Sequence, residues 1–170
     1  LRMRRLHLLR HAKSSWDDPA LRDRDRPLAV RGQKAVGRIE RWVREHDVRP
    51  QLVLCSDARR ARETLEGVLP GLGATEVQIE EGLYAANAQA LVERLRSVPD
   101  DIDEAMLVGH NPGLADLLLL LAEPGELRER AQAKVPTGAL ATLEVELDSW
   151  SELEPGCARL VSFVVPRDIR

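Results

Sequence analysis

Cysteine, aromatic residues and lysine are all scarce in this sequence, and each shortage narrows what the protein can be. The only cysteines, Cys55 and Cys157, lie far apart and lack metal-ligand or redox spacing, so we expect neither a disulfide framework nor a zinc site. With three tryptophans, one tyrosine and one phenylalanine, the core must be built from aliphatic side chains. Of 25 basic residues only Lys13, Lys34 and Lys134 are lysines, so arginine carries nearly all the positive charge.

Long apolar runs and a targeting segment are also missing. No stretch approaches the roughly 18 apolar residues of a transmembrane helix. The start, LRMRRLHLL, is too short in its apolar part for a signal peptide and continues into charge at Arg10. We therefore predict a soluble protein of the reducing cytoplasm. The net charge of −3 gives no general attraction for nucleic acid or an anionic membrane, so we expect neither as a partner.

The apolar residues alternate between strand-like runs and segments of helical spacing. A chain of 170 residues with 44% apolar content fits one domain, over residues 1–170. Residues 31–46 and 57–69 have helical spacing. Residues 114–122 are apolar nearly all round, which indicates either a helix covered on most sides or an apolar surface, and we expect the buried helix. The strand-like runs are 4–9, 52–55, 76–79, 105–109, 139–145 and 159–164. This order predicts an α/β fold, a three-layer α/β/α sandwich around a mostly parallel sheet of about six strands, with the last two strands antiparallel at an edge.

Three of the predicted strands end in residues that can bind phosphate. Strand 4–9 ends in Arg10-His11, strand 52–55 continues into SDARRARET, and strand 105–109 ends in GHNPG. Because the carboxyl ends of parallel strands meet at one edge of a sheet, we expect two histidines and several arginines to converge there. Each motif alone is weak, and their convergence is what predicts a site.

Arg10 and His11 together suit phosphoryl chemistry. Alone, His11 could be a histidine whose ring is satisfied by a backbone hydrogen bond at a strand end. A neutral imidazole is also a good nucleophile toward phosphorus when one ring nitrogen is held and the other faces the substrate. The neighbouring guanidinium of Arg10 would bind phosphoryl oxygens as a two-pronged fork.

His110 is expected beside a helix N-terminus, where an anion is stabilised. Asn111 can cap that helix and Pro112 fits its first turn, while Gly109 and Gly113 allow close backbone approach. His110 by itself could equally be structural.

In the RRAR segment, residues 59–62, the arginines differ in whether a glutamate follows four residues later. Arg59 and Arg62 each have a glutamate four residues on, Glu63 and Glu66. Arg60 has Thr64 at that spacing, so it is the freest arginine, although Glu63 at i+3 could reach it. The alternative is that the whole segment is a solvated helix face.

Other phosphate chemistries lack their motifs. The sequence contains neither G-x-x-x-x-G-K-[ST] nor G-x-G-x-x-G. A cysteine phosphatase needs Arg six residues after the cysteine, and Ala61 stands there after Cys55, so we expect Cys55 to be a small buried residue. A metal site built on His11 and His110 lacks a third ligand and would be surrounded by arginines, so we expect no metal.

The segments LLRHAKSSW, SDARRARET and LVGHNPG, taken together, resemble the histidine phosphatase superfamily, also called phosphoglycerate mutase-like. RHAKS, DRDRPLAVRGQKA and PTGALATL are similar to the small bacterial phosphohistidine phosphatases. The resemblance implies a phosphoglycerate mutase-like fold without a large lid insertion and a metal-independent, cofactor-free phosphatase. The enzyme would work through a phosphohistidine intermediate.

The resemblance also implies roles for individual residues. His11 would be the phosphorylated nucleophile, Arg10 and Arg60 the phosphate forks, and His110 the second pocket histidine. We expect Lys13 and Ser14 at the rim, while Arg26 could reach the phosphate or pair with Asp23 or Asp25. Larger members use a carboxylic acid as proton donor, for which the sequence offers only Glu80 or Glu81, either of which could simply face solvent.

The expected substrate is a phosphohistidine-bearing protein such as a phosphotransfer domain, which suggests a role in signalling. Two alternatives stay open. One is a phosphatase of small phosphorylated molecules, or a phosphoglycerate mutase-type phosphotransferase. The other is a non-catalytic phosphate-binding or phosphoprotein-docking module.

Overall fold

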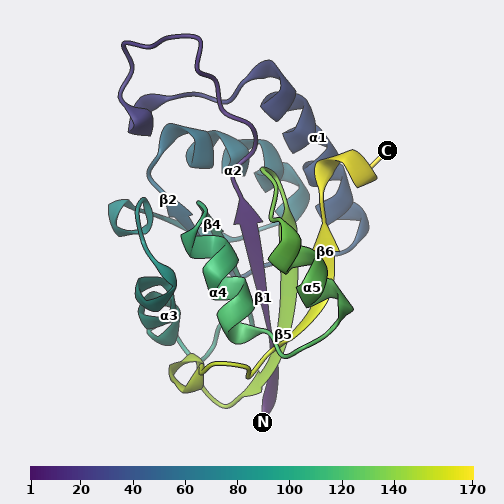
Figure 1. Cartoon of the computed structure of the whole chain (residues 1–170). Coiled ribbons are helices and arrows are strands. Elements are labelled where there is room, and N and C mark those ends of the chain that lie inside the picture. Colours follow the sequence, from purple (N-terminus) through teal and green to yellow (C-terminus); the bar gives the residue numbers. More distant parts are fainter.

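Six strands form one sheet, and each corresponds to one of the predicted strand-like runs (Figure 1). The computed structural model describes all 170 residues. In the order β3-β2-β4-β1-β5-β6 the sheet places β1 near its centre, with β3 and β6 at its edges. The strands are β1 (Arg2–Arg10), β2 (Leu52–Ser56), β3 (Glu76–Glu80), β4 (Glu104–Gly109), β5 (Leu140–Leu147) and β6 (Arg159–Val164).

The strand directions explain why a site forms at one edge of the sheet. β1 is parallel to β4, and β2 is parallel to both β3 and β4. Arg10 at the end of β1 lies opposite Gly109 at the end of β4, and Cys55 near the end of β2 lies opposite Val108. The predicted convergence of the three strand ends is therefore confirmed.

The last two strands pair antiparallel and β6 lies at an edge, as predicted. The antiparallel pairing of β1 with β5 was not predicted. After β4 the chain returns to the end of the sheet at which β1 and β4 finish, and β5 begins there. β5 therefore runs back along β1, with Leu140 opposite Leu9.

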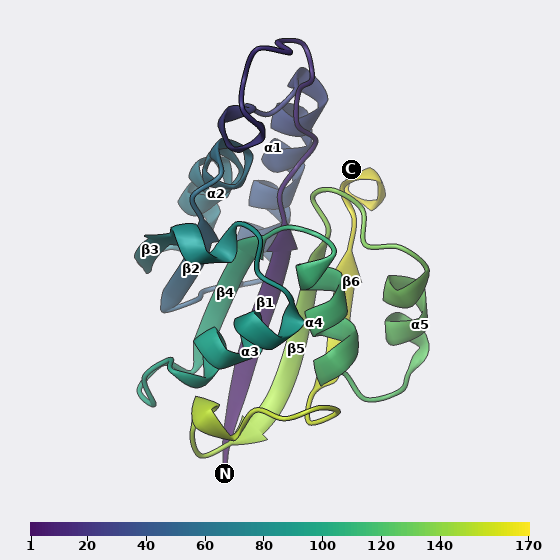
Figure 2. The same ribbon diagram turned by 60° about the vertical axis from the view of Figure 1, so that its left-hand side comes forward.

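Five helices cover the two faces of the sheet, as Figure 2 shows. They are α1 (Val30–Glu45), α2 (Arg59–Leu72), α3 (Ala88–Arg96), α4 (Gly113–Leu121) and α5 (Glu126–Ala133). The predicted helices 31–46, 57–69 and 114–122 correspond to α1, α2 and α4, and the leucine-rich α4 is largely buried as expected. α3 and α5 were not predicted, because each spans fewer than three turns and has no clear helical period. α4 is equally short, and its nearly continuous run of apolar residues is what revealed it.

Alternate residues of the strands enter separate cores on the two faces, which confirms the three-layer arrangement. Leu8 and Leu54 belong to the core under α3 and α4. Leu9 and Val53 belong to the core under α1 and α2. No helix combines the length and the apolar character needed to cross a bilayer.

Candidate active site

His11 directly follows β1 and is 7% exposed. Its Nδ1 lies 2.7 Å from the carbonyl oxygen of Ala12. Because a carbonyl can only accept, Nδ1 carries the ring proton and Nε2 keeps its lone pair. Burial lowers the pKa of His11 to about 3, and the nearby His110, Arg60 and Arg10 add to the effect. The expected backbone bond is thus present, and it leaves a neutral ring with one free nitrogen.

The backbone around His11 is fixed from two sides. The N–H of His11 donates to Gly109 at the end of β4 (3.1 Å), and its carbonyl accepts from the N–H of Gly138 (3.0 Å). The next residue, Ala12, donates to the hydroxyl oxygen of Thr64 (3.0 Å), whose proton is given to the carbonyl of Arg60 (2.7 Å). Thr64 therefore ties the His11 segment to the helical turn that carries Arg60.

His110 lies beside His11, with the two ring centroids 5.1 Å apart. Its Nε2 is 2.7 Å from the hydroxyl of Ser56, whose oxygen also accepts the Ala58 N–H. When the Ser56 proton is donated to Nε2, the ring proton of His110 lies on Nδ1, which is buried without a partner. Burial, followed by the charge of Arg60, lowers the pKa of His110 to about 4. The ring is therefore a neutral donor at pH 7.

Arg10 lines the same cavity and carries a second unpartnered donor. Its Nη1 donates to the carbonyl of Val135 (3.0 Å), whereas its Nε is buried and has no partner. Burial and the charge of Arg60 lower the pKa of Arg10. A buried donor without a partner is costly, and an anion in this position would satisfy it.

Arg60, in the first turn of α2, is 8% exposed, so it does not belong to a solvated helix face. Its Nη2 lies 3.0 Å from the carboxylate of Asp23 and its Nη1 is 2.7 Å from the Asp23 carbonyl. The idea that Glu63 could reach Arg60 is wrong, because Glu63 pairs with Arg59 at 3.0 Å, as its spacing predicts. The predicted Arg62 pair with Glu66 is also wrong, since Arg62 donates to the carbonyl of Asp57.

Asp23 gathers polar side chains beside the site, among them Tyr84, whose ring centroid lies 5.5 Å from that of His110. It pairs with Arg26 at 2.7 Å and accepts from the hydroxyl of Tyr84, in addition to binding Arg60. These hydrogen bonds, that of Tyr84 foremost, hold the pKa of Asp23 well below its usual range. Of the two carboxylates considered as partners of Arg26, Asp23 is the one with which it pairs, while Asp25 pairs with Arg22.

Both histidines and the three arginines described above line one cavity of about 270 Å³. It brings together seven of the predicted residues, and no carboxylate lines it. Trp16, Asn111 and Thr137 also line it and were not predicted as cavity residues. Trp16 is 71% exposed and its ring lies under the guanidinium of Arg26. The predicted residues are Arg10, His11, Lys13, Ser14, Arg26, Arg60 and His110.

The two glutamates suggested as proton donors do not reach this cavity. Glu80 is held by Arg94 of α3 at 2.8 Å, and Glu81 is exposed. The sequence suggested that Asn111 caps α4, and this is wrong. The Asn111 side chain donates to the carbonyl of Val135 at 2.9 Å, and α4 has no side-chain cap. Cys55 is completely buried and desolvation raises its pKa to about 12, in agreement with a structural role.

Comparison with known proteins identifies the family. The model of the histidine phosphatase superfamily (branch 1) matches residues 6–88, which include His11 and Arg60. An uncharacterized protein of Mycobacterium tuberculosis is 39% identical over 163 residues, covering 94% of this chain and 100% of that protein. The chain belongs to the histidine phosphatase superfamily.

Solved structures of this superfamily share the fold over almost the whole chain. Two are each called a "putative phosphohistidine phosphatase SixA". The one from Nakamurella multipartitia has a TM-score of 0.84 and 27% identity and covers 98% of both chains. The one from Agrobacterium tumefaciens has a TM-score of 0.83 and 28% identity, covering 96% of this chain and 98% of its own. They confirm the phosphoglycerate mutase-like fold and support a phosphatase activity.

Proposed function

We propose that this histidine phosphatase is a metal-independent enzyme that removes the phosphoryl group from phosphohistidine on a protein through a phospho-His11 intermediate. The observation that carries the proposal is the state of His11. Its ring is buried and neutral, its Nδ1 is held by the Ala12 carbonyl, and its free Nε2 lies among the donors of a cavity without carboxylates. That combination suits attack on a phosphoryl group.

In the first step, the Nε2 lone pair of His11 forms a bond to phosphorus while the bond from phosphorus to the substrate imidazole breaks. One N–P bond replaces another. The substrate imidazole, protonated on its other ring nitrogen, takes the electron pair of the broken bond and leaves as neutral imidazole, so no strong acid is needed. Positioned proton transfer usually contributes about 10²–10⁴-fold, so a cavity without an acid should be poor on alkyl phosphates. Nε of Arg10, the guanidinium of Arg60 and Nδ1 of His110 would hold the phosphoryl oxygens as charge spreads over them.

In the second step, water attacks phosphorus and the bond to Nε2 breaks. Because Nδ1 kept its proton, the ring of phospho-His11 carries positive charge and leaves readily as neutral imidazole. The proton lost by the water goes to the released phosphate or to solvent. The side chain of His11 then returns to its starting state, with Nδ1 again bonded to Ala12.

A protein substrate fits the open surroundings of His11. We propose that the whole chain, residues 1–170, is one histidine phosphatase domain without a large lid insertion. The 19 residues between β1 and α1 contain no helix longer than the three-residue turn Asp23–Asp25, and they carry the exposed Trp16 at the cavity. A phosphotransfer domain in cytoplasmic signalling is the partner that we propose.

The test measures inorganic phosphate released from a histidine-phosphorylated phosphotransfer domain, with 3-phosphoglycerate as an alkyl phosphate. We expect kcat/KM on the protein to exceed that on 3-phosphoglycerate by at least about 10²-fold. His11→Ala should retain less than a tenth of the turnover with an unchanged circular dichroism spectrum. A preference for 3-phosphoglycerate would favour a small-molecule phosphatase, and phosphate transferred without release would favour a mutase. Tight vanadate binding without any turnover would favour a binding module.

A further inference from the structure

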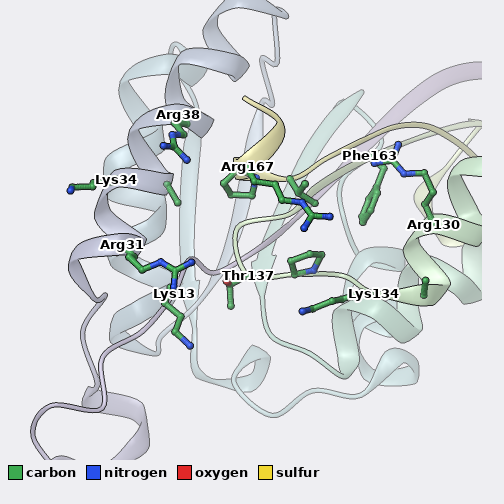
Figure 3. Close-up of a pocket in the computed structure, with 14 residues that line it drawn as sticks. Lys13, Arg31, Lys34, Arg38, Arg130, Lys134, Thr137, Phe163 and Arg167 are labelled. Atoms are coloured by element: carbon green, nitrogen blue, oxygen red, sulfur yellow. The ribbon is translucent and has the colours of Figure 1, made fainter. Parts of the chain in front are cut away.

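A second cavity, of about 550 Å³, is larger than the catalytic one and shares Lys13 and Thr137 with it. Figure 3 shows the residues that line it. Its walls come from α1, from the end of α5 with the residues that follow it, and from the chain after β6. Seven of its fourteen lining residues are basic, none is acidic, and all three lysines of the chain are among them. We call this cavity the basic groove, and its cations are Lys13, Arg31, Lys34, Arg38, Arg130, Lys134 and Arg167.

The cations of the basic groove have almost no anionic partners within the protein. Only Arg130 forms an ion pair, with Asp168 at 3.9 Å. The other six make neither an ion pair nor a side-chain hydrogen bond. Of the 25 basic residues of the chain, Arg170 is the only one outside the groove that also lacks both.

This gathering does not follow from the overall charge, which is −3. Apart from Arg170, the basic residues elsewhere in the protein are paired with carboxylates or backbone carbonyls, whereas here six unpaired cations line a common hollow. Like charges that lie together repel one another, and a bound anion relieves that repulsion. The groove is therefore built to attract an anion with several charges.

The chemistry of the walls favours a flexible acidic chain over a small molecule. Pockets for small molecules fix their ligand with a few precisely placed polar groups. In the basic groove the cations sit on long, mostly exposed side chains, while the buried part of the wall, Phe163 and Val165, is apolar. No carboxylate or side-chain amide is present to bind a ribose or sugar hydroxyl. Such a surface selects for charge, as complementary protein interfaces do.

The basic groove also continues into the catalytic cavity, since Lys13 and Thr137 line both. We propose that the groove binds an acidic segment of the substrate protein, rich in Asp and Glu and close in sequence to its phosphohistidine. This inference rests on the proposed function, because it names the kind of protein that the same site would accept. The acidic segment would lie along the groove while the phosphoryl group reaches His11.

The first test compares two synthetic phosphohistidine peptides, one flanked by four acidic residues and one by neutral residues. Lys34→Glu/Arg38→Glu removes two groove cations on the exposed side of α1, and the matched control is Arg2→Glu/Arg159→Glu, two exposed arginines of β1 and β6 that do not line the groove. We expect the wild type to prefer the acidic peptide by about tenfold or more in kcat/KM. The groove variant should lose that preference and keep its activity on the neutral peptide, and the control should keep both. Equal rates on the two peptides with the wild type would overturn the inference.

A binding measurement separates this inference from the proposed function. Fluorescence anisotropy follows a labelled acidic peptide without phosphohistidine, in parallel with its neutral counterpart, so no turnover is needed. We expect the wild type and the control variant to bind the acidic peptide and the groove variant to bind it at least about tenfold more weakly. If neither phosphohistidine peptide is hydrolysed, the proposed function fails, and this measurement still decides on the groove. The inference is overturned if the wild type fails to bind the acidic peptide, or if the groove variant binds it equally well. It is also overturned if the wild type binds tripolyphosphate but not the acidic peptide, since the ligand of the groove would then be a small anion.

Discussion

Replacing His11 by Asn should make the protein less sensitive to acid. Asn keeps a donor that can reach the Ala12 carbonyl, but it cannot be protonated. In the folded wild type, burial holds the pKa of His11 near 3, whereas the unfolded chain has the ordinary value of 6.5. The unfolded state therefore takes up a proton first as the pH falls, so the stability tied to His11 is complete above pH 6.5 and is lost between pH 6.5 and 3.

The size of the effect follows from these two pKa values. At pH 4.5 protonation of His11 stabilises the unfolded state relative to the folded state by about 3 kcal/mol, whereas at pH 7.5 it contributes almost nothing. The difference in unfolding free energy between His11→Asn and the wild type should therefore shift by about 2–3 kcal/mol in favour of the variant over this range. The contribution of all other groups cancels in that difference to a first approximation.

Urea unfolding at a series of pH values measures the shift. Fluorescence is a suitable signal, because Trp150 is completely buried and becomes exposed on unfolding. Between pH 7.5 and 8.5 the two curves should run parallel, which serves as the internal control. If the difference in unfolding free energy between His11→Asn and the wild type changes by less than about 0.5 kcal/mol between pH 7.5 and 4.5, the claim that folding keeps His11 neutral is refuted.

Two further substitutions test the site and its support. Arg60→Ala should lower kcat/KM by about 30–5,000-fold, equivalent to about 2–5 kcal/mol, because a buried guanidinium that binds the phosphoryl group is lost; steady-state kinetics with an unchanged kcat/KM would remove Arg60 from the site. Gly113→Ala should destabilise the protein by more than about 2 kcal/mol in urea unfolding, since the added Cβ would lie 2.1 Å from the Ala86 carbonyl oxygen. The matched Gly37→Ala, whose Cβ meets nothing within 4 Å on α1, should stabilise it by about 0.5–1 kcal/mol, and equal effects of the two substitutions would contradict the packing argument.

Much of the fold and of the site could be predicted because the signals are local. The apolar run before Arg10 specifies a strand, and the parallel order then brings its end to that of β4, beside His110. Helical spacing alone set Arg60 apart as the arginine without a glutamate four residues on. It is the buried arginine of its segment, but it is not free, because it pairs with Asp23.

What could not be predicted depends on contacts between distant segments. Asp23 reaches Arg60 across 37 residues of sequence, and no spacing rule connects them. Glu80 is held by Arg94 of a helix too short to be recognised from its period. The basic groove is assembled from the loop after β1, from α1 and from the chain after β6, so its charge is visible only in three dimensions.

The most direct test of the central claim is a rapid-quench experiment with a phosphotransfer domain labelled with ³²P on its histidine. The reaction is stopped in alkali within milliseconds, and acid-labile label on the enzyme is mapped by peptide digestion. We expect label on the peptide that carries His11, appearing before free phosphate and disappearing as phosphate is released. Release of phosphate with no label on His11 at any time would contradict it.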